Sequence, residues 1–172
     1  MKQLGYSLLF IIVILSGCKK DVRVRTTGTD TIDNVRHLTT TWFTYGFSFS
    51  TGKLISTETT PKPDITVDTL TTARPNVYLQ GSINTFFAKI GDYPDENSAK
   101  AAFDGLKSVS VTNWQDWANP ILPNQVWVFK SGSDLYTKFR IITIIQRRDQ
   151  GIPVTEITFQ WVHQPDGSLT FP

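Results

Sequence analysis

Apolar and polar side chains alternate along the middle of the chain, a pattern typical of half-buried β-strands because successive side chains point to opposite faces. The alternation is clearest over residues 42–50, where aromatic side chains take one face and small or hydroxyl-bearing residues take the other. The aromatic face consists of Phe43, Tyr45, Phe47 and Phe49. We therefore predict a strand here that packs its aromatic face into a core.

A turn and a returning strand are expected directly after this segment. Gly52 can adopt a positive φ angle, so residues 54–58 are predicted to pair with the aromatic strand. Pro61 and Pro63 lack the backbone N–H that a central strand needs. We therefore predict a loop or an edge segment for residues 59–70.

The last third of the chain has the strongest β pattern, and a short strand over residues 77–83 is predicted ahead of it. The four C-terminal strands are expected at residues 125–130, 135–146, 154–163 and 169–171. Short segments rich in Gly, Ser and Asp separate them and favour tight turns, so the strands should form an antiparallel meander. One face of the third strand carries Ile157, Phe159, Trp161 and His163.

One helix is predicted, over residues 96–106. Asp95 offers an N-cap, and Glu96 places a negative charge in the first turn. Apolar residues recur at helical spacing at Ala99, Ala102, Phe103 and Leu106. The predicted fold class is therefore mainly β, an antiparallel meander built as a closed sheet or a sandwich, with one short helix.

The N-terminal residues show the pattern of a signal peptide. Lys2 precedes an apolar run whose core, residues 8–15, is much shorter than the roughly 20 residues of a membrane-spanning helix. Two small residues then precede Cys18, the only cysteine. The sequence Leu15-Ser16-Gly17-Cys18 resembles the lipobox of bacterial lipoproteins, which implies cleavage before Cys18 and lipidation of its thiol. The alternative is an ordinary signal peptide with an incidental cysteine.

This organisation predicts a protein that is held on a membrane of the cell envelope, the outer membrane being favoured, by several acyl chains. Residues 1–17 are the expected signal peptide, residues 18–33 a polar tether, and residues 34–172 a single β-rich domain. Lys19 and Lys20 stand where some surface-exposed lipoproteins carry an acidic cluster. The inner or outer face of the membrane is therefore left open.

Charge and motif content argue against two classes of function. The formal net charge is +2 and no basic block is present, so a nucleic-acid partner is not expected. The chain has no glycine-rich phosphate loop and no nucleophile elbow, and lipidation would remove its one thiol. We therefore expect a protein that is not an enzyme.

Three stretches, in this order along the chain, resemble the HmuY-like lipoproteins of Bacteroidetes, a family that includes haem-binding proteins of haem-acquisition systems. They are the aromatic segment 41–53, the segment 73–82 around Arg74, and the meander from residue 125 to the end. The resemblance implies an almost entirely β fold. It also implies capture of haem and its transfer to an outer-membrane transporter.

The same resemblance implies two histidine or two methionine ligands to the haem iron, and no position here takes that role. Met1 is the only methionine, and residues 113–120, ahead of the meander, contain no histidine. His37 and His163 are expected to be solvated or strand-end residues, so no metal ligand is assigned. The tyrosines that could ligate ferric haem in principle, although core packing is expected for them, are Tyr45, Tyr78, Tyr93 and Tyr136.

Trp114 and Trp117 are the candidate ligand-binding residues. Two indoles in a polar loop could form a flat apolar wall for a ring-shaped ligand, or they could close one end of the domain. The first function considered is a ligand-capturing lipoprotein that binds haem or another flat apolar molecule without bis-histidine ligation. The second is a non-catalytic interaction or structural lipoprotein of the envelope that has lost the haem site.

Overall fold

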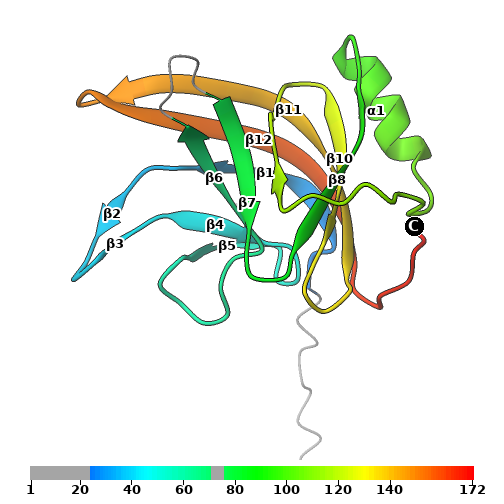
Figure 1. The fold of residues 1–172 in the computed structure, drawn as a ribbon, viewed down its shortest axis with the longest axis horizontal. Coiled ribbons are helices and arrows are strands. Elements are labelled where there is room, and N and C mark those ends of the chain that lie inside the picture. Colours follow the sequence, from blue (N-terminus) through cyan, green and yellow to red (C-terminus); the bar gives the residue numbers. More distant parts are fainter. Residues whose placement is uncertain (1–23, 71–75) are drawn as a thin grey trace, which may run out of the picture.

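The computed structural model describes residues 24–70 and 76–172, so Cys18 and the predicted signal peptide lie outside the described residues. The described chain is mainly β, with antiparallel sheets and one short helix, which confirms the predicted fold class (Figure 1). Of the two predicted arrangements, the sandwich is the one observed. Two five-stranded sheets pack against each other and do not close into a barrel.

The C-terminal meander forms the middle of the first sheet. In spatial order this sheet contains β1 (Thr27–Asp33), β12 (Ile152–Gln164), β11 (Tyr136–Asp149), β10 (Gln125–Lys130) and β8 (Phe86–Asp92). The second sheet contains β5 (Lys53–Ser56), β4 (Tyr45–Ser48), β6 (Ile65–Leu70), β7 (Asn76–Gly81) and β9 (Trp117–Ala118). A two-stranded ribbon, β2 (His37–Leu38) with β3 (Trp42–Phe43), connects β1 to β4 along the chain.

Aromatic side chains from both sheets meet in the core. The ring of Phe47 on β4 lies 5.4 Å from that of Phe159 and 5.2 Å from that of Trp161, both on β12. All three residues are fully buried, and each contributes about 1.5–3 kcal/mol through removal of apolar surface from water. The predicted inward face of β12 is therefore confirmed, and it includes His163, which is also buried.

The hairpin formed by β11 and β12 extends beyond the rest of the first sheet. Its two turn residues, Gln150 and Gly151, have φ angles of 49° and 85°, a combination that matches the right-handed twist of paired strands. The register of β10 against β11 reaches only Arg140, whereas β11 continues to Asp149. The hairpin tip therefore projects at one end of the sandwich, near the ribbon of β2 and β3 (Figure 1).

Helix α1 (Glu96–Gly105) forms where it was predicted. The Asp95 carboxylate accepts a hydrogen bond of 2.8 Å from the backbone N–H of Ser98, which satisfies one free donor of the first turn. The last turn receives Lys138 from β11, whose Nζ donates to the carbonyl oxygens of Phe103 at 2.8 Å and Leu106 at 2.9 Å. The helix is thus fixed to the outer face of the first sheet.

The predicted tether is too long. Residues 27–33 form β1 and pair along their whole length with β12, from Thr27 opposite Val162 to Asp33 opposite Glu156. Only Ile32 of this strand is buried, and the segment lacks the apolar alternation of a typical strand. Hydrogen bonding to β12, and not the residues' own β propensity, therefore holds it in an extended conformation. The remaining tether residues that precede Val24 lie outside the described residues.

Residues 65–70 correct a second prediction, because they form β6, the central strand of the second sheet, instead of a loop or edge segment. Pro61 and Pro63 both precede the strand and therefore remove no hydrogen bond from its ladder. Ile65 and Val67 are buried on its inner face. The prolines mark the approach to the strand.

The predicted aromatic strand is divided at Thr44 into β3 and β4. Phe47 and Phe49 reach the core as expected, but Tyr45 is 39% exposed and packs outside it with Phe43. Because of this break, β3 pairs with β2 in the ribbon, whereas β4 pairs with β5 in the second sheet. The partner strand expected at 54–58 is confirmed as β5.

The C-terminal end and one further strand also differ from expectation. Residues 169–171 do not form a strand; they make a single β-bridge, between Thr170 and Ser108, and bury Phe171 against the segment after α1. β8, by contrast, was not predicted, although it pairs with β10 along the edge of the first sheet. The strand expected at 77–83 is present as β7.

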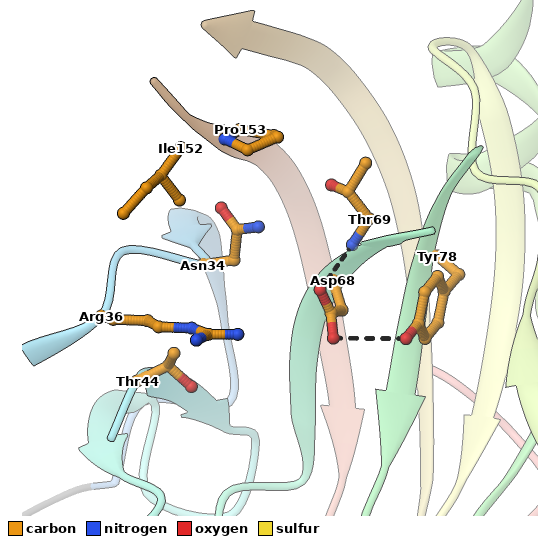
Figure 2. A pocket seen from close by; sticks show the side chains of 8 residues that line it. All are labelled: Asn34, Arg36, Thr44, Asp68, Thr69, Tyr78, Ile152 and Pro153. Atoms are coloured by element: carbon orange, nitrogen blue, oxygen red, sulfur yellow. Dashed lines mark hydrogen bonds between the residues drawn. The ribbon is translucent and has the colours of Figure 1, made fainter. Parts of the chain in front are cut away.

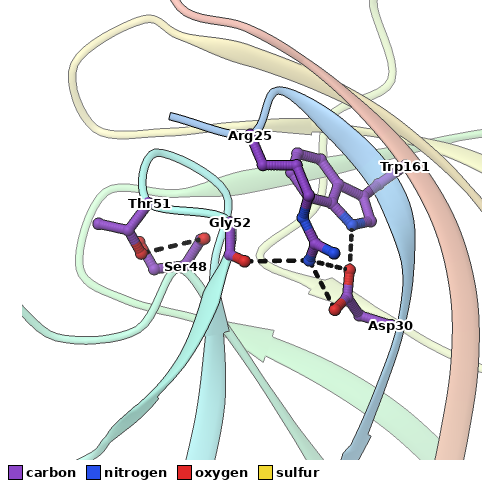
Figure 3. A network of polar contacts seen from close by, with 6 residues as sticks. All are labelled: Arg25, Asp30, Ser48, Thr51, Gly52 and Trp161. Atoms are coloured by element: carbon purple, nitrogen blue, oxygen red, sulfur yellow. Dashed lines mark hydrogen bonds and ion pairs between the residues drawn. The ribbon is translucent and has the colours of Figure 1, made fainter. Parts of the chain in front are cut away.

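A polar network fixes the first described residues to both sheets (Figure 3). The Arg25 guanidinium pairs with the Asp30 carboxylate on β1 and donates to the Gly52 carbonyl oxygen at 3.0 Å in the turn between β4 and β5. The indole Nε1–H of Trp161 donates to the same carboxylate at 2.7 Å, and Arg25 lies 5.4 Å from that ring. This network therefore ties the segment that leads into β1 to both sheets.

Candidate functional site

Trp114 and Trp117, the tryptophans predicted to form one wall, pack against different sheets. Trp114 approaches Tyr136 of β11 at a ring-centroid distance of 6.4 Å. Trp117 is part of β9 and stacks on Tyr78 of β7 at 5.2 Å with an interplanar angle of 23°. The structure therefore does not bring the two indoles together as a flat binding surface. The other interpretation, in which they close one end of the domain, stays a prediction.

The two histidines lie near opposite ends of β1 and cannot hold one metal ion. The backbone N–H of His163 donates to Thr26, just before β1, whereas His37 follows the far end of that strand. Seven strand residues span roughly 20 Å. His163 is buried, with its Nδ1 2.8 Å from the Thr137 hydroxyl and its Nε2 without a partner among the described residues. Burial lowers its pKa because desolvation penalises the charged imidazolium.

His37 belongs instead to an aromatic cluster on the ribbon. Its ring lies 5.4 Å from that of Phe43 and 5.1 Å from that of Tyr45. His37 and Phe43 are cross-strand partners, so they project from one face of the ribbon, and Leu38 and Trp42, the next pair, project from the other. The expectation of a metal-free His37 stays a prediction, but its packing explains how the ring is held.

A cleft at the open end of the sandwich is the best candidate site. It lies between the ribbon and the hairpin tip, and it has a volume of about 400 Å³, within the range of small-molecule sites. Figure 2 shows its lining residues, which come from the segments on either side of β2 and β3, from β6 and β7, and from the start of β12. We call this region, together with its extension beside Trp42, the hairpin cleft. The residues of its main part are Asn34, Arg36, Thr44, Asp68, Thr69, Tyr78, Ile152 and Pro153.

The extension is a second cavity of about 340 Å³ that shares Asn34, Arg36 and Ile152 with the main part. Trp42 borders it and is 66% exposed, and Leu38, its cross-strand partner, is also exposed. An indole so exposed gains little from folding, since most of its apolar surface stays in water. Its place at the cleft makes it available to a ligand.

Opposite charges line the two sides of the cleft without neutralising each other. Arg36 extends into the space from the ribbon side, and no described residue forms an ion pair with it (Figure 2). Asp68, on the opposite side, accepts hydrogen bonds from the Thr69 backbone N–H at 2.7 Å and from the Tyr78 hydroxyl at 3.3 Å. Each carboxylate oxygen of Asp68 therefore keeps free acceptor capacity.

The tyrosine of this cleft remains a neutral phenol. Desolvation, followed by the nearby Asp68 charge, raises the pKa of Tyr78. A phenol with a raised pKa is a poor source of the phenolate that ferric iron prefers. The other three tyrosines named as possible haem ligands lie outside the residues that line the main cleft.

The hairpin cleft does not fit the haem coordination that the family resemblance implies. The described residues that line its two parts include no histidine, methionine or cysteine. In the part of the chain that the structure describes, no three His, Cys, Asp or Glu side chains gather closely enough to hold a metal ion. The described residues also contain no helix with the length and apolarity needed to cross a membrane.

The key cleft residues were missed because the fold, not the sequence, brings them together. Arg36 and Asp68 are separated by more than thirty positions and carry no motif. The sequence contains one weak indication that Trp42 is exposed. It follows the polar run Thr39-Thr40-Thr41, which is unusual beside an indole of the core. No known family model and no curated protein matches this chain, so the site itself carries the functional argument.

Proposed function

We propose that this protein is a lipid-anchored, non-catalytic binding protein of the cell envelope that captures a ring-shaped small ligand in the hairpin cleft. The observation that supports this most strongly is the exposed indole of Trp42 beside one cavity, which shares Arg36 with the adjoining cavity that Asp68 lines. A ring can stack on the indole while the polar side chains fix its orientation. Transfer of the ligand to an outer-membrane transporter completes the proposed role.

The proposed lipid anchor and the hairpin cleft belong to opposite ends of β1, which suits the same function. Lipidation of Cys18 would place the acyl chains six residues before Val24 in the sequence, on the N-terminal side of the Arg25 network at the start of β1. The hairpin cleft lies beyond the other end of β1, which is roughly 20 Å long. With the anchor attached at the N-terminal end of β1, the proposed arrangement puts the cleft at the end of that strand that is not attached, where a soluble ligand and a partner can reach it.

Haem coordination by two protein ligands forms no part of this proposal, because the described lining of the cleft contains neither histidine nor methionine. The test is a titration of the full lipidated chain, in detergent micelles, with ferric and ferrous haem and with metal-free protoporphyrin. We expect no sharp low-spin spectrum, and any Soret change should be broad and weakened by Trp42→Ala. His37→Ala should leave the spectra unchanged.

Two outcomes would contradict the proposal. A tight one-to-one low-spin complex that is lost in His37→Ala or in His163→Ala would move the site away from the cleft and restore axial ligation. Absence of saturable binding for porphyrins and for the saccharides discussed below would favour the second function, an interaction or structural lipoprotein without a ligand.

A further inference from the structure

The polarity of the hairpin cleft identifies the chemistry of its ligand. Six of the eight residues that line its main part carry a polar group, and only Ile152 and Pro153 are apolar. A ligand with few polar groups would cover the Arg36 guanidinium and the free acceptor positions of Asp68 without giving them hydrogen bonds, at a cost for each group removed from water. The cleft is therefore suited to a ligand that is itself rich in hydrogen-bonding groups.

The polar groups include both donors and acceptors. Arg36 offers several N–H donors that no described residue occupies with an ion pair. The Asn34 Oδ1 atom accepts from the Thr155 backbone N–H at 2.7 Å, which leaves its amide N–H₂ as a further donor. The Asp68 carboxylate provides acceptor positions on the opposite side. Hydroxyl groups both donate and accept, so a polyhydroxylated ligand matches this mixture.

The charges and the shape of the cleft narrow the class of ligand further. Arg36 and Asp68 carry opposite charges across one cavity, so neither a strongly anionic nor a strongly cationic ligand gains from both sides. The exposed indole of Trp42 offers a flat apolar surface at the adjoining cavity. A sugar ring combines these properties, because its hydroxyls lie around the rim and its C–H groups form an apolar face.

We propose that the hairpin cleft binds neutral oligosaccharides, with one sugar ring stacked on Trp42 and the next held by Arg36 and Asp68. The two connected cavities, of about 400 Å³ and 340 Å³, provide space for more than one ring. This inference rests on the proposed function, since it names the ligand class of the same site. No bond is made or broken, and the saccharide is released unchanged.

The test is isothermal titration of the full lipidated chain with neutral oligosaccharides of glucose, mannose and xylose. The detergent must lack a sugar headgroup, because such a headgroup would compete for the cleft. We expect saturable one-to-one binding for at least one saccharide. Loss of the stacking partner in Trp42→Ala should weaken it about two- to tenfold, and Trp42→Phe should retain part of the affinity.

Arg36→Ala should weaken the same binding about tenfold or more, as expected for loss of a charged donor. The matched controls are Trp114→Ala, an indole outside the cleft, and Ile83→Ala, an 87% exposed apolar residue outside it, and both should bind like the wild type. The thermal unfolding midpoints of Trp42→Ala and Arg36→Ala should stay unchanged, because neither residue is in the core.

The outcomes separate this inference from the proposed function. Saccharide binding that is insensitive to Trp42→Ala and Arg36→Ala would overturn the inference. So would binding of protoporphyrin but of no saccharide, although the proposed capture function would survive that result. Failure of both ligand classes would contradict the inference and the function together, and release of new reducing ends from the saccharide would contradict a role limited to binding.

Discussion

At the residue scale, buried polar groups of the first sheet depend on single partners. The indole Nε1–H of Trp161 has the Asp30 carboxylate as its acceptor, and Trp161 is fully buried (Figure 3). Asp30→Ala should lower the free energy of unfolding by about 1–3 kcal/mol, because it leaves that N–H without a partner. Chemical denaturation measures the loss.

Asp30→Asn is the matched control for this substitution. Its amide oxygen can still accept from the indole, whereas the ion pair with the partly exposed Arg25 is lost, so a cost below about 1 kcal/mol is expected. Equal losses in Asp30→Ala and Asp30→Asn would show that the ion pair, and not the indole hydrogen bond, stabilises this corner.

His163, another single residue, should make the stability of the domain depend on pH. Burial lowers the pKa of His163 below the ordinary value of 6.5, so the unfolded chain binds a proton at a higher pH than the folded chain does. The free energy of unfolding should therefore fall as the pH drops from about 7.5 to about 5.5, across the unfolded pKa. His163→Asn keeps a polar group near the Thr137 hydroxyl and should show a shallower fall in urea titrations at these pH values. An identical fall in both proteins would refute this assignment.

At the element scale, the ribbon of β2 and β3 is the least supported part of the described sheets. Each of its strands has two residues, and a two-stranded ribbon alone is only marginally stable. β10, by contrast, is paired on both sides, with β11 and β8, and five of its six residues are buried. Amide hydrogen exchange should therefore be fast in the ribbon and slow in β10.

Ligand binding should change this exchange pattern locally. A bound saccharide contacts Arg36 and Trp42 in our proposal, so residues 34–44 and the hairpin tip should become protected while β10 stays as it was. Mass spectrometry after deuterium labelling measures the change. If protection were confined to β9 and the residues next to it, the ligand would bind at Trp117 and not in the hairpin cleft.

The individual strands and the helix also show which parts of the fold could be predicted from the sequence. The meander and α1 were predictable because their periodicity, caps and turns are local, and turn residues such as Gly151 adopt the required positive φ. β1 was missed because its polar residues are held by pairing with β12, and β6 because prolines that precede a strand resemble prolines within one. The hairpin cleft assembles residues from separate segments of the chain, such as Arg36 and Asp68, so no local pattern could reveal it.

At the scale of the whole molecule, the account depends on Cys18. Cys18→Ala should abolish labelling of the protein by a radioactive or clickable fatty acid and should release it from the membrane fraction or leave it uncleaved. Unchanged acyl labelling would refute the lipobox assignment. The binding affinity of the domain should not change, because the cleft and the Arg25 network lie at opposite ends of β1.

The central claim, ligand capture in the hairpin cleft, is tested most directly by the indole N–H signals of the five tryptophans in a ¹⁵N-correlated NMR spectrum. Titration with the best-binding neutral oligosaccharide should move the signal of Trp42 progressively and to saturation. The signals of Trp127 and Trp161, which are buried, and of Trp114, which packs on Tyr136, should stay in place. A saturating shift of Trp114 or Trp117 with Trp42 unmoved would contradict the claim.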